Sequence, residues 1–196
     1  MKCGTRFWLS VAIMLPTLVI AQTKPRRSTS TTNATIVKYD VLNNSGGPLR
    51  VFYSDGTIVE IPKERGRVRD GNTALTQEAF SEVQIADDRV HLGWLADYLV
   101  CAQSYACHID LVILRRGRPV RYVSTSGAGV VWDWTFLNNG AQVVVESGFP
   151  HGDALGRFEL FDSDSGQRRG TFVPDPDGEK PAPPWVEAFR SLRRRR

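Results

Sequence analysis

The chain has 196 residues and a formal net charge of +4, a length that is enough for one domain with a sizeable core. The stretch 28–189 holds 15 of the 25 lysines and arginines and all 21 acidic residues, so this part carries a charge of −6. A basic body is therefore excluded, and the positive charge lies at the two ends of the chain.

The first 21 residues have the order of a secretory signal peptide. A cationic start precedes an apolar run over 7–21, and Val19 and Ala21 have the small side chains that a signal peptidase prefers before its cut. We expect cleavage before Gln22 and export to the periplasm or the medium of a bacterial cell. The run is shorter than the roughly 20 apolar residues that span a bilayer, and Pro16 interrupts it, so a retained membrane anchor is the alternative.

The rest of the chain divides into three parts by composition. Residues 22–35 are rich in serine, threonine and basic residues without apolar periodicity, which predicts a disordered leader. Residues 36–173 have the short alternating segments of a β-rich domain. Residues 174–196 form a proline-rich linker followed by an arginine-rich tail.

The β-rich domain begins with a predicted hairpin. Alternating apolar residues at 49–53 and 57–61 flank the turn Ser54-Asp55-Gly56. The charged stretch 62–79 contains the turn residues Asp70-Gly71-Asn72 and is predicted to be a surface loop.

The middle of the chain repeats with a period near 50 residues. Residues 85–94 align without gaps on 136–145, and each segment reads as a strand, a polar turn and a second apolar strand. Farther on, Ile109-Asp110-Leu111 aligns on Phe158-Glu159-Leu160 in the next strand of each copy.

A glycine marks the turn before the last strand of each copy, Gly117 in the first and Gly166 in the second. The hairpin at the start of the domain resembles the second half of a copy, with Gly56 at the equivalent place. Each full copy is therefore predicted to hold four short antiparallel strands in two hairpins, over 80–123 and 131–173.

Four antiparallel strands in each copy of about 50 residues resemble the blades of β-propellers. The order of strands and turns over 36–173 is similar to TolB-type and WD-repeat blades. This resemblance implies an all-β fold of antiparallel four-stranded, propeller-like blade repeats, with two full copies and a partial one. These are fewer than the roughly four blades of the smallest usual propellers. We therefore expect an open stack or sandwich rather than a closed propeller, with self-association as a further way to complete the core.

The longest loops follow the second strand of each copy, and they are expected at one end of the sheets, where binding residues tend to collect. The first of them, 96–108, holds Tyr98 and Tyr105 together with Cys101 and Cys107. Removal of the signal peptide leaves this even cysteine pair, which favours a disulfide in an exported chain. A redox pair or thiolate ligands would need Cys-x-x-Cys spacing or further ligands, which the sequence lacks.

Two histidines fall in these loops, each two residues before an aspartate. His108 precedes Asp110, and His151 precedes Asp153. Imidazole and carboxylate groups suit a zinc-type ion, so His108, His151 and Asp153 are the candidate metal ligands. Local hydrogen bonding within polar loops is the plainer interpretation, and no cofactor is expected.

Two patterns bear on catalysis. Ser126 lacks the Gly-x-Ser-x-Gly elbow that exposes a nucleophilic serine, so its small-residue segment is predicted to link the two copies. Asp133 and Glu146 are carboxylates of the kind that glycosidases pair, and their separation in space would decide whether they can act together.

Trp132 and Trp134 lie two residues apart in a predicted strand, so alternation places them on one face. Core packing is one interpretation of this pair. The other is that they line a ligand groove together with the loop residues Tyr98, Tyr105 and His151.

The tail combines two predicted helical turns over 185–192 with a run of arginines. Trp185, Phe189 and Leu192 fall on one face of these turns. An anionic membrane or polyanion could contact the basic residues Arg190, Arg193, Arg194, Arg195 and Arg196. A solubilising, disordered end is the alternative.

No convergent set of catalytic residues emerges from the sequence. We therefore expect an exported, non-catalytic binding domain that recognises a protein or a cell-envelope component through its long loops. The alternative is an exported metal-dependent or glycan-acting hydrolase that uses His108, His151 and nearby carboxylates.

Overall fold

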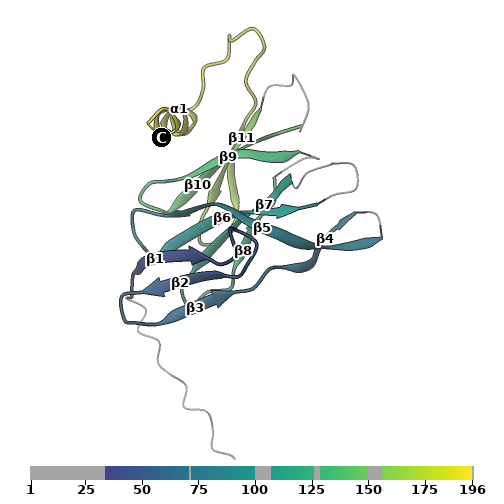
Figure 1. Ribbon diagram of the computed structural model, residues 1–196. Helices are drawn as coiled ribbons and strands as arrows, with labels where there is room; N and C mark the ends of the chain where they lie inside the picture. The colour runs from purple at the N-terminus through teal and green to yellow at the C-terminus, as the bar shows by residue number, and fades with distance from the viewer. Residues whose placement is uncertain (1–33, 71, 100–106, 126–128, 150–155, 196) are drawn as a thin grey trace, which may run out of the picture. The chain divides into compact units, whose positions relative to one another are not determined.

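Three antiparallel sheets and one helix make up the part of the chain that the computed structural model describes, which is residues 34–70, 72–99, 107–125, 129–149 and 156–195 (Figure 1). The sheets follow one another in the sequence, and each is a meander in which neighbouring strands are also neighbours in the chain. None of them closes into a barrel, which confirms the predicted all-β fold of open sheets.

The first sheet has the order β1 (Ile36–Val41), β2 (Leu49–Tyr53), β3 (Ile58–Ile61). The predicted hairpin is its second half. Asp55 Oδ1 accepts a hydrogen bond from the backbone N–H of Thr57 at 3.0 Å, and Gly56 takes a φ of 80°, which glycine adopts without strain.

The second sheet has five strands in the order β4 to β8: β4 (Arg65–Asp70), β5 (Thr73–Ile85), β6 (His91–Tyr98), β7 (Cys107–Arg115) and β8 (Arg121–Val123). The surface loop predicted over 62–79 is wrong, because β4 and the start of β5 form a hairpin there. This segment alternates arginine with small residues and so lacks the apolar face that marks a strand in a sequence.

The third sheet contains β9 (Val130–Leu137), β10 (Gln142–Gly148), β11 (Arg157–Asp162) and β12 (Arg168–Phe172). It has the topology of β5 to β8, so the predicted repeat is confirmed. The aligned positions of the first hairpin pair in the same way in the two sheets: Ile85 pairs with Leu92, and Phe136 pairs with Val143. The third strand is shifted by two residues from the predicted alignment, which leaves every side chain on its expected face.

Apolar side chains from the first two sheets form one core cluster. Strand β6 is buried along its whole length because its two faces pack against different sheets. Leu92, Trp94 and Tyr98 face the first sheet, where they meet Leu49 and Val51.

A second cluster joins the second and third sheets, and it contains Leu95 from the opposite face of β6. Gly93 lies under the indole of Trp134, and a Cβ atom added at Gly93 would come within 2.5 Å of Trp134 Cη2. The missing side chain therefore makes room for the largest side chain of this interface.

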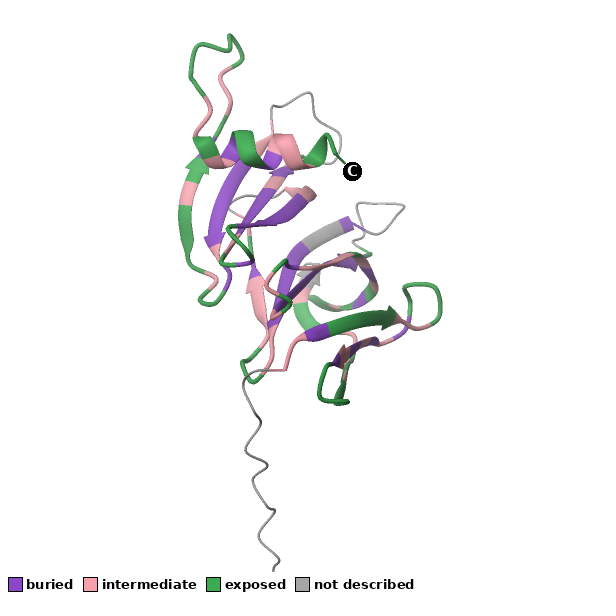
Figure 2. Ribbon diagram, turned by 90° about the vertical axis from the view of Figure 1, so that its left-hand side faces the viewer, coloured by how far each residue is buried: buried purple, intermediate pink, exposed green. Residues whose placement is uncertain are grey.

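Helix α1 (Pro184–Arg193) covers the other face of the third sheet (Figure 2). Its first residue is a proline, which suits the start of a helix because no intrahelical partner is needed for the missing N–H. Val186 and Phe189 are buried against Val144 and Leu160 of the sheet. The residues predicted to be a linker and tail therefore contribute one layer of the fold.

The outer face of the first sheet ends the stack at the other side. The side chains that face away from the core are mostly charged: Lys38 lies 4.7 Å from the ring centroid of Phe52, and Arg50 pairs with Glu60 at 3.0 Å. The stack thus ends in a sheet with a charged outer face on one side and in an amphipathic helix on the other. Both end layers expose polar side chains to water, as the ends of an open stack require.

Candidate functional site

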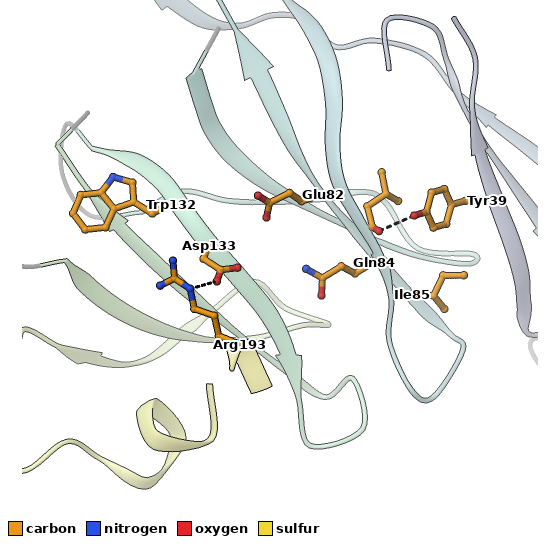
Figure 3. A pocket seen from close by; sticks show the side chains of 8 residues that line it. Tyr39, Glu82, Gln84, Ile85, Trp132, Asp133 and Arg193 are labelled. Atoms are coloured by element: carbon orange, nitrogen blue, oxygen red, sulfur yellow. Dashed lines mark hydrogen bonds and ion pairs between the residues drawn. The ribbon is translucent and has the colours of Figure 1, made fainter. Parts of the chain in front are cut away.

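A groove of about 780 Å³ runs between the second half of β5 and the start of β9, and the end of α1 forms part of its wall (Figure 3). Glu82 and Gln84 face it from β5, Trp132 and Asp133 line it from β9, and Arg193 lies at its rim. Its size is within the range of about 300–1,000 Å³ typical of ligand sites.

A β-bulge shapes the β5 wall of the groove. The pairing of β5 with β6 shifts register between Ser81 and Gln84, and Glu82 takes a φ of 47°, which is uncommon for a residue with a side chain. Tyr39 Oη donates a hydrogen bond to the carbonyl oxygen of Val83 at 3.0 Å, so the first sheet holds this bulge in place. The bulge turns the Glu82 carboxylate towards β9.

A second bulge shapes the β9 wall. Val131 pairs with Ser147, and Asp133 pairs with Glu146. Trp132 is therefore the extra residue of the bulge, because no residue of β10 lies between those two partners. The indole of Trp132 lies over Gly148 and over Gly156, where an added Cβ would overlap it or come within 2.7 Å. These glycines make room for the ring.

The same bulge corrects the prediction that Trp132 and Trp134 share a strand face and line one groove. Trp134 is fully buried in the cluster between the second and third sheets, with its ring 5.2 Å from that of Phe136 in an edge-on arrangement. The extra residue separates the two indoles, so only Trp132 reaches the groove.

Two carboxylates and one guanidinium meet at the rim. Asp133 and Glu146 are opposite each other on β9 and β10. Arg193 Nε lies 3.1 Å from Asp133 Oδ2, and Arg193 Nη1 lies 2.8 Å from Glu146 Oε2. The two carboxylate side chains are only 16% and 13% exposed, whereas that of Arg193 is 56% exposed.

Burial is the main reason that the pKa of Glu146 is raised above its ordinary value, and the charge of Asp133 adds to this effect while Arg193 opposes it. A smaller cavity of about 220 Å³ lies on the other side of the same guanidinium, between Glu146 and Phe189. Arg193 therefore lies between the groove and this cavity. Its positive charge compensates two mostly buried carboxylates, which would destabilise the fold without a cation.

A different polar cluster occupies the end of the second sheet, where the first long loop begins. Tyr98, a predicted ligand-binding residue, is fully buried, and its Oη donates to Glu64 Oε2 at 2.8 Å. Burial and this hydrogen bond raise its pKa. Asp110 pairs with Arg67 at 3.0 Å and accepts from the Ser124 hydroxyl. These hydrogen bonds and ion pairs stabilise the end of the sheet.

Cys107 begins β7 and is buried, and burial raises the pKa of its thiol, with a further contribution from Asp97. Its predicted partner lies outside the described residues, so the disulfide stays a prediction. Other residues with predicted roles also lie outside the described residues, so those roles stay predictions: Cys101, Tyr105, His151, Asp153, Arg196 and the side chain of His108. Among the described residues, no group of three His, Cys, Asp or Glu side chains could hold a metal ion.

Each of the two long loops leaves its sheet with an exposed apolar residue. Leu99 follows β6 and is 50% exposed, and Phe149 follows β10 and is 58% exposed. Because β6 and β10 occupy the same place in the repeat, both loops leave at the same end, as predicted. Trp132 packs on Gly148 and Gly156, so the groove begins at the base of the second loop.

Two of the arginines predicted to contact an anionic surface contact the domain itself. Arg190 pairs with Glu187 at 2.8 Å and lies 5.3 Å from the ring centroid of Phe158. Arg193 holds the two carboxylates at the rim, whereas Arg194 and Arg195 are exposed. In the part of the chain that the structure describes, no helix is long and apolar enough to cross a membrane.

The sequence missed Glu82, Gln84 and Arg193 as groove residues, because the strand bulges and the position of α1 leave no mark in a local pattern. The sequence did single out Asp133 and Glu146 as a possible carboxylate pair, and the structure places them opposite each other on β9 and β10.

The described residues define a class of fold: an open stack of propeller-like antiparallel sheets closed by a C-terminal helix. Comparison with protein-family models, with curated proteins and with solved structures gives no significant match for this chain.

Proposed function

We propose that the chain is an exported, non-catalytic binding domain that recognises a protein or a cell-envelope component at the end of the sheets where the long loops leave. The observation that carries this proposal is the groove between β5 and β9. It combines a half-buried aromatic ring with carboxylates and an amide on a rigid support, which is the composition of recognition sites.

The groove has a fixed shape, which favours recognition of a defined ligand. Its two walls belong to sheets that share a buried core, and Gln84 Nε2 joins them by donating to the carbonyl oxygen of Trp134 at 3.1 Å. A pre-organised site loses less conformational entropy on binding than a flexible one. The neighbouring Phe149 would extend the contact surface onto the loop end.

Export is part of this proposal, and it rests on the cationic and apolar start of the chain. We expect the mature protein to begin at Gln22. N-terminal sequencing of the protein purified from its native compartment would check this, and an intact Met1 on an extracytoplasmic protein would instead support the retained anchor.

Affinity capture with paired variants tests the groove. The tagged mature chain is used to capture partners from the native cell envelope, in parallel with Trp132→Ala and Trp185→Ala. Trp185 is a partly buried indole of α1 and lies outside the groove. We expect Trp132→Ala to lose the captured species and Trp185→Ala to keep them. Equal capture by all three proteins would show that the groove is not the binding site.

A glycan-acting hydrolase is the second candidate, because Asp133 and Glu146 are paired and burial raises the pKa of Glu146. Against it, one guanidinium contacts both carboxylates, which opposes their use on a water molecule and a leaving group. Release of reducing ends from purified cell-wall glycan by the native chain, abolished in Glu146→Gln, would favour this candidate over the binding domain.

A further inference from the structure

The Arg193 guanidinium at the rim of the groove is placed so that another cation can displace it from Asp133 and Glu146. Asp133 and Glu146 are mostly buried carboxylates from neighbouring strands, so their positions are fixed by the sheet. Two such groups need a cation close by, and a planar guanidinium can satisfy both at once. Arg193 supplies that cation from another element of the fold.

Arg193 is the last residue of α1, and the anchors of the helix lie earlier in the chain. Val186 and Phe189 are buried in the sheet, whereas more than half of the Arg193 side chain is in solvent. Removing the guanidinium from the carboxylates would therefore leave the apolar contacts of the helix in place. A long, exposed side chain at a helix end is also the kind that exchanges position rapidly.

The groove continues well beyond the space that Arg193 fills. From Asp133 it passes the ring of Trp132 and reaches Glu82 on the opposite wall (Figure 3). A half-buried indole that lines a groove next to carboxylates is suited to a cationic side chain, because the ring face attracts positive charge.

We infer that the groove binds an arginine side chain of an extended basic segment in a partner protein, and that Arg193 is the built-in competitor which that arginine displaces. This inference rests on the proposed function, since it names the ligand chemistry of the same groove. Arginine is favoured over lysine because the two carboxylates are arranged for a planar group with several donors.

A peptide titration tests the inference on the full mature chain. The probe is a short acetylated peptide amide with one arginine between glycine and serine residues, and its control has citrulline in place of that arginine. Citrulline keeps the shape and removes the charge. We expect the arginine peptide to change the tryptophan fluorescence of the native chain with saturation, and the citrulline peptide to leave it unchanged.

Two matched substitutions at the end of one helix identify the competitor. Arg193→Gln should bind the arginine peptide about tenfold more tightly than the native chain, since a charge-assisted contact no longer has to be displaced. Arg194→Gln removes the neighbouring exposed guanidinium, which does not line the groove, and it should bind as the native chain does. Asp133→Asn, which keeps Arg193, should bind about tenfold more weakly.

Equal binding of the arginine and citrulline peptides, or an unchanged affinity in Arg193→Gln, would overturn the inference. If Arg193→Gln does not fold, the comparison of the native chain with Asp133→Asn still decides whether the carboxylate binds the peptide. The proposed function fails separately, because it predicts that Trp132→Ala loses capture of the native partner whatever the charge of the peptide. Retained capture in Trp132→Ala would show that the partner does not bind in the groove.

Discussion

The second and third sheets are copies of one repeat, and they differ most in the layer that packs next to them in the stack. The face of β6 that carries Leu95 packs against the third sheet. The equivalent face of β10 carries Glu146, and the chain has no further sheet to place there among the described residues. Helix α1 takes that place, with Phe189 over the apolar part of the face and Arg193 over the acidic part.

The comparison shows how a buried acidic pair with its own arginine arises at the end of the repeat. In the first copy the face that meets the next sheet is mainly apolar, because a whole sheet covers most of it. In the second copy a helix covers only part of the face, and the edge of the sheet carries carboxylates and a bulge. The two carboxylates and Arg193 lie where the repeat is no longer followed by another copy, at the rim of the groove between the two copies.

Phe189→Ala should have the largest effect on stability, because it removes the largest buried side chain of α1, the layer that replaces a sheet. We expect a loss of about 3–5 kcal/mol in the free energy of unfolding, measured by urea denaturation. Glu187→Ala, on the exposed side of the same helix, serves as the control and should change the stability by about 0.5 kcal/mol or less. A loss in Phe189→Ala no larger than in the control would show that α1 is not a layer of the fold.

Arg168→Ala tests a polar difference between the copies. Glu159 is fully buried and pairs with Arg168 at 2.9 Å, whereas the equivalent residue of the first copy is Val112. Leaving the carboxylate without this partner should cost about 3 kcal/mol in unfolding free energy.

The neighbouring Arg169→Ala breaks only an exposed pair with Asp162 and should cost about 1 kcal/mol or less. The double variant Glu159→Val with Arg168→Ala imitates the first copy and should recover most of the lost stability. Equal losses in Arg168→Ala and Arg169→Ala would contradict the importance of the buried pair.

Gly93→Ala probes the contact between the two copies. The new methyl group would come within 2.5 Å of Trp134, so we expect a loss of about 1–3 kcal/mol on thermal or chemical unfolding. Combining it with Trp134→Leu removes the clashing ring. The double variant should then be more stable than the sum of the two single losses predicts. Strict additivity would mean that the two residues do not meet.

Glu146→Gln gives the smallest expected effect, and it depends on pH. Burial raises the pKa of Glu146 in the folded chain above its ordinary value of 4.5. The folded chain therefore holds this proton more tightly than the unfolded chain does. The contribution of Glu146 to stability is complete below pH 4.5 and is lost as the pH rises through its raised value.

Relative to Glu146→Gln, the native chain should thus lose about 1 kcal/mol or less of stability between about pH 4 and pH 7. Urea denaturation at several pH values measures this difference. A native chain that gains stability over this interval relative to Glu146→Gln would mean that the ion pairs with Arg193 outweigh the burial.

The sequence predicted most of the strand pairing, since alternation and turn residues act over a few neighbouring positions. The hairpin around Gly56 and the hairpin over 85–94 follow from such local signals. The β4 hairpin was missed, because its arginines give it no apolar face. The bulges at Glu82 and Trp132 depend on how neighbouring strands pair, so no local pattern indicates them.

The sequence also predicted only part of what α1 does in the structure. Its apolar face could be predicted from Trp185, Phe189 and Leu192, and the structure packs these residues against the third sheet. What the sequence could not show is the apolar surface that receives it, which depends on Val144 and Leu160 facing the same way from two strands. The position of Arg193 over Asp133 and Glu146 follows from that docking.

The central claim is that a ligand cation takes the place of Arg193 at the two carboxylates. It can be followed directly by NMR through the side-chain Nε–Hε signal of Arg193, assigned by its loss in Arg193→Gln. We predict that the arginine peptide shifts this signal to the position of a solvated guanidinium as binding saturates, while the citrulline peptide leaves it in place. An Arg193 signal that stays unchanged when the arginine peptide is fully bound would contradict the claim.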